Sequence, residues 1–158
     1  MKKILTISTL FILIIGFSGC EKNCIKNRPK DIKSIDWNYY NDVYTVYWNY
    51  YSLFSERKQD DEGKIIKISG WKIQSADGFA LCDDPKYAED NSGYTASPPR
   101  IEINGYYVPE LQNMLDTCDF KKKCFINGQL SFFEIHSGSC LKCVPEIIIT
   151  DINDIYFE

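Results

Sequence analysis

The chain has 158 residues, a formal net charge of −4 and many aromatic side chains, with eleven Tyr, nine Phe and three Trp. Its length suits one domain with its own hydrophobic core. The negative charge is a poor match for nucleic acid, whose binding rests on Lys and Arg meeting phosphates, so no nucleic-acid partner is expected. The single histidine, His136, excludes a zinc site built from several histidines.

The first twenty residues form a targeting segment. Lys2 and Lys3 precede an uncharged apolar stretch, and Ser18-Gly19-Cys20 closes it. This order is typical of a secretory signal and is too short for a stable membrane span. With a cysteine directly after the small pair, the segment resembles a bacterial lipoprotein signal. The resemblance implies that the Cys20 thiol is acylated and becomes the mature N-terminus.

This resemblance divides the chain into a signal peptide (residues 1–19), a lipidated tether (20–35) and a folded domain (36–158). The expected location is the bacterial cell envelope, on the periplasmic face of the outer membrane, with the lipid as the membrane contact. The alternative is ordinary cleavage near Gly19, which would release a soluble protein.

Six cysteines remain when Cys20 is set aside for lipid. In an exported chain an even number predicts a disulfide framework of up to three bridges, whose connectivity the spacing does not decide. The candidates are Cys24, Cys82, Cys118, Cys124, Cys140 and Cys143.

The order of elements is read from hydrophobic periodicity. The pattern predicts strands at residues 43–54, 64–74, 79–82, 100–105, 125–135 and 146–157, and a helix at 109–116. Residues 43–54 read as a long strand because they are almost wholly aromatic or β-branched. Gly70 stands where the second strand changes phase, which predicts a β-bulge or sharp bend. Pro109 suits a first helical position, and Leu111 and Met114 share one helix face.

The order of these elements indicates an all-β domain with one short helix. Four segments carry a resemblance to a known fold: Ser69-Gly70-Trp71, Phe79-Ala80-Leu81, Asn127-Gly128-Gln129-Leu130 and the closing strand from Ile147 to Phe157. The arrangement resembles the five-stranded OB-fold barrel, in which one helix lies between the third and fourth strands. Another small β-barrel or a β-sandwich is the alternative.

Candidate catalytic groups are few. His136 falls in a predicted loop at residues 136–145, where a solvated role is expected, and no catalytic residue, cofactor or metal is predicted. Two alternatives use the cysteines: a zinc site of Cys118, Cys124, Cys140 and Cys143, and a redox pair, Cys140 and Cys143, which lacks the helix that would activate it. The acidic runs at residues 60–62 and 83–84 read as solvated loops, although facing carboxylates could hydrolyse glycosides.

Aromatic side chains supply the candidate ligand-binding residues. On a strand, Tyr44, Trp48 and Tyr50 would share one face while Tyr47 and Tyr51 would share the other. One set would fill the core and the other would be free to stack on sugars or peptides. The candidates are Tyr44, Tyr47, Trp48, Tyr50, Tyr51 and Trp71.

These observations predict a lipid-anchored, non-enzymatic module that binds an envelope protein, peptide or glycan. The first alternative is an immunity or inhibitor lipoprotein that blocks a basic toxin or hydrolase through charge complementarity. The second alternative is an enzyme that uses the acidic loops.

Overall fold

The structure, a computed structural model, describes residues 28–53, 59–75, 78–89, 99–105, 108–117, 122–137 and 140–158. Its strands are β1 (Asn41–Asp42), β2 (Ser52–Leu53), β3 (Ile65–Ser75), β4 (Gly78–Cys82), β5 (Arg100–Asn104), β6 (Lys123–Ser137), β7 (Cys140–Ile148) and β8 (Ile155–Phe157). The helices are α2 (Val43–Tyr50), α3 (Lys86–Glu89) and α4 (Pro109–Thr117), with 3-10 turns η2 (Gln59–Asp61) and η3 (Ile152–Asp154). None of the helices in these ranges is both long and apolar enough to span a bilayer.

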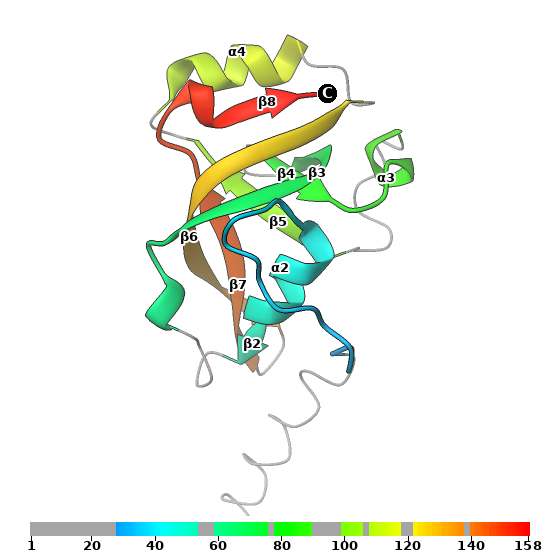
Figure 1. Cartoon of the computed structure of the whole chain (residues 1–158), viewed down its shortest axis with the longest axis vertical. Coiled ribbons are helices and arrows are strands. Elements are labelled where there is room, and N and C mark those ends of the chain that lie inside the picture. The colour runs from blue at the N-terminus through cyan, green and yellow to red at the C-terminus, as the bar shows by residue number, and fades with distance from the viewer. Residues whose placement is uncertain are drawn as a thin grey trace, which may run out of the picture.

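Five strands close into a barrel in the order β3-β4-β5-β7-β6, with β6 returning to pair with β3 (Figure 1). All neighbouring pairs in this ring are antiparallel except β5 and β7, which run parallel. Helix α4 lies in the chain between the third and fourth barrel strands. This arrangement is that of an OB-fold-like barrel, so the predicted fold class is confirmed.

The predicted strand at residues 43–54 is wrong, because most of this segment is helix α2. Asp42 caps the helix by accepting a hydrogen bond from the Thr45 backbone N–H at 2.6 Å. Val43, Val46 and Tyr50 fall on one helical face and enter the barrel core. The first barrel strand is therefore β3, and the motifs around Gly70 lie on the first strand of the barrel.

The prediction of a loop at residues 136–145 is also wrong. β6 and β7 form a long hairpin whose pairing runs from Gln129 opposite Ile148 to Ser137 opposite Cys140. The predicted final strand, residues 146–157, divides into the end of β7, the turn η3 and the short strand β8. Asp151 causes this break, since its side chain accepts from the Asn153 backbone N–H at 2.9 Å and starts the turn.

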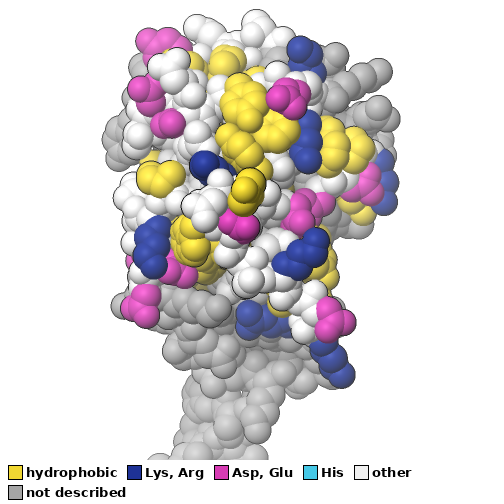
Figure 2. Space-filling view, viewed as in Figure 1, with side chains coloured by type: hydrophobic (Ala, Val, Ile, Leu, Met, Phe, Trp, Pro, Cys, Tyr) yellow, Lys and Arg dark blue, Asp and Glu magenta, His cyan; other side chains and the backbone are white. Residues whose placement is uncertain are grey.

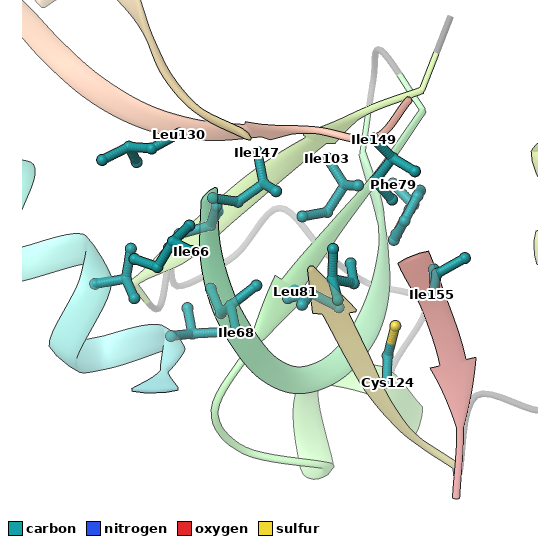
Figure 3. Close-up of a cluster of buried hydrophobic side chains, with 14 of the residues drawn as sticks. Ile66, Ile68, Phe79, Leu81, Ile103, Cys124, Leu130, Ile147, Ile149 and Ile155 are labelled. Atoms are coloured by element: carbon teal, nitrogen blue, oxygen red, sulfur yellow. The ribbon is translucent and has the colours of Figure 1, made fainter. Parts of the chain in front are cut away.

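The interior of the barrel is aliphatic (Figure 3). Strand residues that point inward alternate along each strand, and α2 and α4 add Val43, Val46 and Leu111 to the same cluster. Fully buried side chains include Ile66, Ile68, Leu81, Ile101, Ile126, Leu130 and Ile147. Burial of such a side chain stabilises the fold by about 1.5–3 kcal/mol.

Gly70 does not mark a β-bulge, because β3 pairs with β6 without an inserted residue from Ile65 to Trp71. The alternation of apolar residues along β3 changes phase because apolar side chains lie on both faces of this strand. Ile68 points into the barrel, whereas Ile73 belongs to a second, outer cluster with Ala80 and Cys82. Gly70 is required for close approach, since a Cβ there would lie 2.8 Å from both the Cys82 carbonyl oxygen and a Val43 methyl group.

Candidate functional site

Four of the predicted aromatic residues, Tyr44, Tyr47, Trp48 and Tyr50, lie on helix α2 and Tyr51 follows it, so the expected division by strand parity is wrong. Helical spacing puts Tyr44, Tyr47, Trp48 and Tyr51 together, with Tyr47 stacked on Tyr51 at 4.9 Å between ring centroids. Trp48 contacts Tyr47, Tyr51 and Tyr44 edge-on at 5.1, 5.6 and 6.4 Å. Tyr50 points the other way, into the core.

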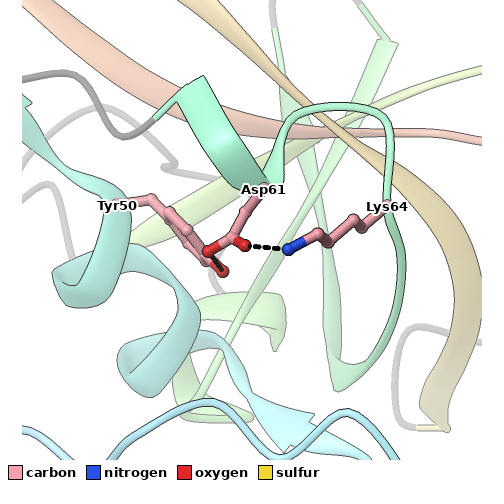
Figure 4. A network of polar contacts seen from close by, with 3 residues as sticks. All are labelled: Tyr50, Asp61 and Lys64. Atoms are coloured by element: carbon pink, nitrogen blue, oxygen red, sulfur yellow. Dashed lines mark hydrogen bonds and ion pairs between the residues drawn. The ribbon is translucent and has the colours of Figure 1, made fainter.

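Tyr50 has a structural role (Figure 4). Its side chain is 3% exposed, its ring centroid lies 5.6 Å from that of Phe132, and its hydroxyl donates to Asp61 Oδ2 at 3.1 Å. Lys64 Nζ bonds the other oxygen of Asp61 at 2.5 Å. Burial raises the pKa of Tyr50, so the phenol stays a hydrogen-bond donor. Through these two contacts Asp61, from the acidic run at residues 60–62, links α2 to the start of β3.

The remaining helix aromatics contact mainly one another and the barrel wall. Tyr51 is buried, with Lys142 Nζ 5.6 Å from its ring centroid, and burial raises the pKa of Tyr47. Tyr44 is the one member of the group among the large exposed hydrophobic residues, at 39%. This cluster therefore packs α2 onto the barrel more than it offers ring faces to a ligand.

Trp71 belongs to a different surface, on the outer face of β3, β6 and β8. It pairs across the strands with Lys123, whose Nζ lies 5.2 Å from the Trp71 ring centroid and 5.6 Å from that of Phe125. Phe125 is stacked on Tyr156 at 5.0 Å with an interplanar angle of 5°. We call Tyr40, Trp71, Lys123, Phe125 and Tyr156 the aromatic–lysine stripe. Figure 2 shows hydrophobic side chains gathered on one face of the molecule, with basic and acidic side chains beside them.

Tyr40 joins the stripe from the segment that precedes β1. Its ring meets Phe125 and Tyr156 edge-on at 5.2 and 6.2 Å, and its hydroxyl donates to Asn127 Oδ1 at 3.2 Å. Burial, followed by the neighbouring Tyr156 side chain, raises the pKa of Tyr40 to about 12. Asn41 fixes the backbone here, because its Nδ2 donates to the Lys67 carbonyl at 3.1 Å.

Sequence reasoning identified Trp71 but missed Tyr40, Phe125 and Tyr156. A signal for two of them was present in the alternation of the strands. Cys124 and Ile126 point inward, so Phe125 between them points outward, and the same holds for Tyr156 between Ile155 and Phe157. The pairing of β6 with β8 that puts the two rings side by side was not readable from the sequence.

The second acidic run also has structural partners. The oxygens of Asp83 accept hydrogen bonds from the backbone N–H groups of Val43, at 2.8 Å, and Tyr44, at 2.5 Å. Burial, and then the charge of Asp42, raise the pKa of Asp83 to about 6. Asp84 forms an ion pair with Lys86 at 2.7 Å. Within the described ranges, no group of three or more His, Cys, Asp or Glu residues could hold a metal ion.

The predicted disulfide framework is not seen among the cysteines that the structure describes. Cys82, Cys124 and Cys143 are fully buried on barrel strands, and no disulfide joins them to one another. Cys82 and Cys124 pair with Trp71 and Gly70, adjacent residues of β3, so their side chains point to opposite faces of the sheet.

Cys82 is a buried thiol within 3.4 Å of the Asp84 carbonyl oxygen, and burial raises its pKa to about 11. His136 and Cys140 lie on the β6–β7 hairpin. Cys20, Cys24 and Cys118 lie outside the described residues, as does the whole targeting segment.

Comparisons of the chain with protein-family models, with curated proteins and with solved structures find no match.

Proposed function

We propose that this protein is a lipid-anchored, non-enzymatic binding module of the bacterial cell envelope, and that the aromatic–lysine stripe contacts its ligand. The observation that carries the proposal is the group of half-buried and exposed aromatic side chains on the outer face of β3, β6 and β8. Tyr156 is 41% exposed although its ring is already stacked on Phe125. Aromatic rings with a polar end are enriched where proteins meet partners, because they offer large apolar area and a hydrogen bond together.

The contrast with the helix cluster supports this assignment. The rings of Tyr47 and Tyr51 pack between α2 and the barrel, and Tyr51 is buried. In the stripe the rings stand on the outside of three adjacent strands, with Lys123 between two of them. The non-enzymatic character is supported by the described carboxylates of the two acidic runs, since Asp61, Asp83 and Asp84 each hold structural partners.

A screen of the full-length chain in detergent micelles tests this proposal. Immobilised protein is exposed to peptides and to neutral and acidic oligosaccharides, and each ligand found is measured again with Tyr156→Ala. The control is Tyr39→Ala, at a tyrosine that is 72% exposed and outside the stripe. The proposal expects binding to be lost in Tyr156→Ala and kept in Tyr39→Ala. A ligand that binds both variants and wild type equally would place the site elsewhere.

The immunity or inhibitor alternative uses the same surface with a protein as its partner. The net charge of −4 favours a basic toxin or hydrolase, and tyrosine and tryptophan are frequent hot-spot residues. Its distinguishing result would be inhibition of a basic hydrolase by the wild-type chain that Tyr156→Ala abolishes.

A further inference from the structure

We propose that the ligand of the aromatic–lysine stripe is an acidic oligosaccharide whose carboxylate binds Lys123 while its sugar rings lie on the neighbouring aromatic side chains. This inference rests on the proposed function and names its ligand class. It depends on the charge state and the surroundings of one lysine, and on the polar groups around the rings.

Lys123 forms no ion pair with the part of the chain that the structure describes. Lys64, Lys86 and Arg100 each pair with a carboxylate at 2.5, 2.7 and 2.9 Å. Among the described residues, no carboxylate lies within ion-pair distance of the Lys123 ammonium, which lies between the rings of Trp71 and Phe125. Asp83 lies within electrostatic range of Lys123, but its oxygens accept the hydrogen bonds of α2.

The aromatic rings of Trp71 and Phe125 hold the Lys123 ammonium in place. Cation–π contacts keep the long lysine side chain against Trp71 and Phe125 and remove part of its hydration. A carboxylate approaching from solvent therefore meets an ordered, partly dehydrated cation. Such charge-assisted hydrogen bonds are about twice as strong as neutral ones.

The width of the stripe and the polar groups beside its rings suit a sugar chain. Trp71, Phe125 and Tyr156 lie on three adjacent strands, so the stripe spans roughly 10 Å across the sheet from strand spacing alone. Apolar ring surface suits the carbon–hydrogen faces of sugars. The Tyr40 hydroxyl donates to Asn127 Oδ1 at 3.2 Å, and the ring of Tyr156 lies beside that of Tyr40, so polar groups lie next to the rings for sugar hydroxyls.

The charge of the surroundings selects against denser polyanions. The chain is acidic overall, and Asp83, Asp84 and the C-terminal Glu158 lie on elements next to the stripe. A nucleic acid or a polyglutamate peptide carries closely spaced charges that these carboxylates repel. A lysine that contacts aromatic rings, and that no described carboxylate pairs with, matches a ligand whose charges are sparse and separated by apolar surface.

The test titrates the full-length chain in detergent micelles by calorimetry. The probes are a short gluco-oligomer that carries one glucuronate residue, the neutral gluco-oligomer of the same length, oligothymidylate and oligoglutamate. The expected result is that the glucuronate-containing oligomer binds about tenfold more tightly than each other probe, with an affinity that falls as salt increases.

The deciding variant is Lys123→Gln, with Lys122→Gln as the matched control because it removes the same charge from the adjacent exposed residue. Lys123→Gln is expected to weaken binding of the glucuronate-containing oligomer about tenfold and to leave binding of the neutral oligomer unaffected, whereas Lys122→Gln changes neither. Near-ultraviolet circular dichroism and the melting temperature confirm that both variants fold.

Three results would overturn the inference: equal affinity for acidic and neutral oligomers, unchanged binding in Lys123→Gln, or preference for oligothymidylate or oligoglutamate. If Tyr156→Ala still abolishes the binding of another ligand, the proposed function survives and only the acidic-sugar assignment fails. If Tyr156→Ala leaves all binding intact, both fail.

Discussion

Asp83 accepts a hydrogen bond from the backbone N–H of Val43 at 2.8 Å, across 40 residues of sequence. Its other oxygen accepts from the next N–H of the helix, so one carboxylate just after β4 serves two of the N–H groups that lack partners at the start of α2. This contact joins the end of the second barrel strand to the helix that fills one side of the core, and the burial of the carboxyl beside Asp42 makes the fold sensitive to pH.

The pH dependence has a definite sign. The pKa of Asp83 is raised from 3.8 to about 6 in the folded state, so folding favours its protonated form. The stabilisation is complete below pH 3.8 and is lost as pH rises through about 6. Relative to Asp83→Asn, the wild type should therefore lose about 1–2 kcal/mol of unfolding free energy across this range. Urea unfolding of both proteins at a series of pH values measures the difference.

Asp84→Asn is the control for that experiment. Lys86 lowers the pKa of the exposed Asp84 carboxyl, so this difference should have the opposite sign and weaken in salt. A wild-type curve parallel to that of Asp83→Asn would contradict the raised pKa of Asp83.

Gly70→Ala should destabilise the fold through crowding between α2 and β4. The added Cβ would lie 2.8 Å from both a Val43 methyl group and the Cys82 carbonyl oxygen, which predicts a loss of about 1–3 kcal/mol. Adding Val43→Ala removes one of the two clashes, so the double variant should lose less than the sum of the single variants. Chemical denaturation of the four proteins measures this coupling, and strict additivity would show that the two sites do not meet.

Tyr50→Phe should lower stability by about 1 kcal/mol, because it removes the hydroxyl that donates to Asp61 and leaves the ring in the core. Tyr44→Phe is the matched control, since Tyr44 is 39% exposed and lies on the opposite side of the same helix. Thermal unfolding compares the two variants. Equal melting temperatures would mean that the Asp61 hydrogen bond contributes nothing net.

Cys82 should resist alkylation in the native protein at neutral pH. It is fully buried and its pKa is raised to about 11, so little reactive thiolate is present. Iodoacetamide labelling followed by peptide mapping, with and without urea, gives the measurement. Rapid labelling without urea, or a mapped disulfide at Cys82, would contradict the structure at this residue.

Lipid attachment at Cys20 predicts that Cys20→Ser leaves the membrane fraction, whereas Cys24→Ser remains with it. Acyl chains anchor through about 0.8 kcal/mol per buried methylene, and their loss removes the anchor. Cell fractionation and the intact mass of the purified protein provide two independent readings. Membrane retention of Cys20→Ser without any added lipid mass would exclude this anchor.

Local patterns in the sequence determined the all-β class, strands β3 to β6 and helix α4. Alternating side chains show which residues of β5 and β6 face inward, and Pro109 with Leu111 and Met114 indicates a helix before any packing is known. These properties depend on residues close together in the chain, and they sufficed for the OB-fold-like barrel.

Tertiary contacts decided the rest. Residues 43–50 are aromatic and β-branched enough for a strand, but the hydrogen bonds to the distant Asp83, added to the local Asp42 cap, and the burial of Val43 and Val46 made them a helix. The aromatic–lysine stripe likewise exists only after β3, β6 and β8 pair and bring Trp71, Lys123 and Tyr156 side by side. Such neighbours are set by strand register and long-range hydrogen bonds, which no local pattern records.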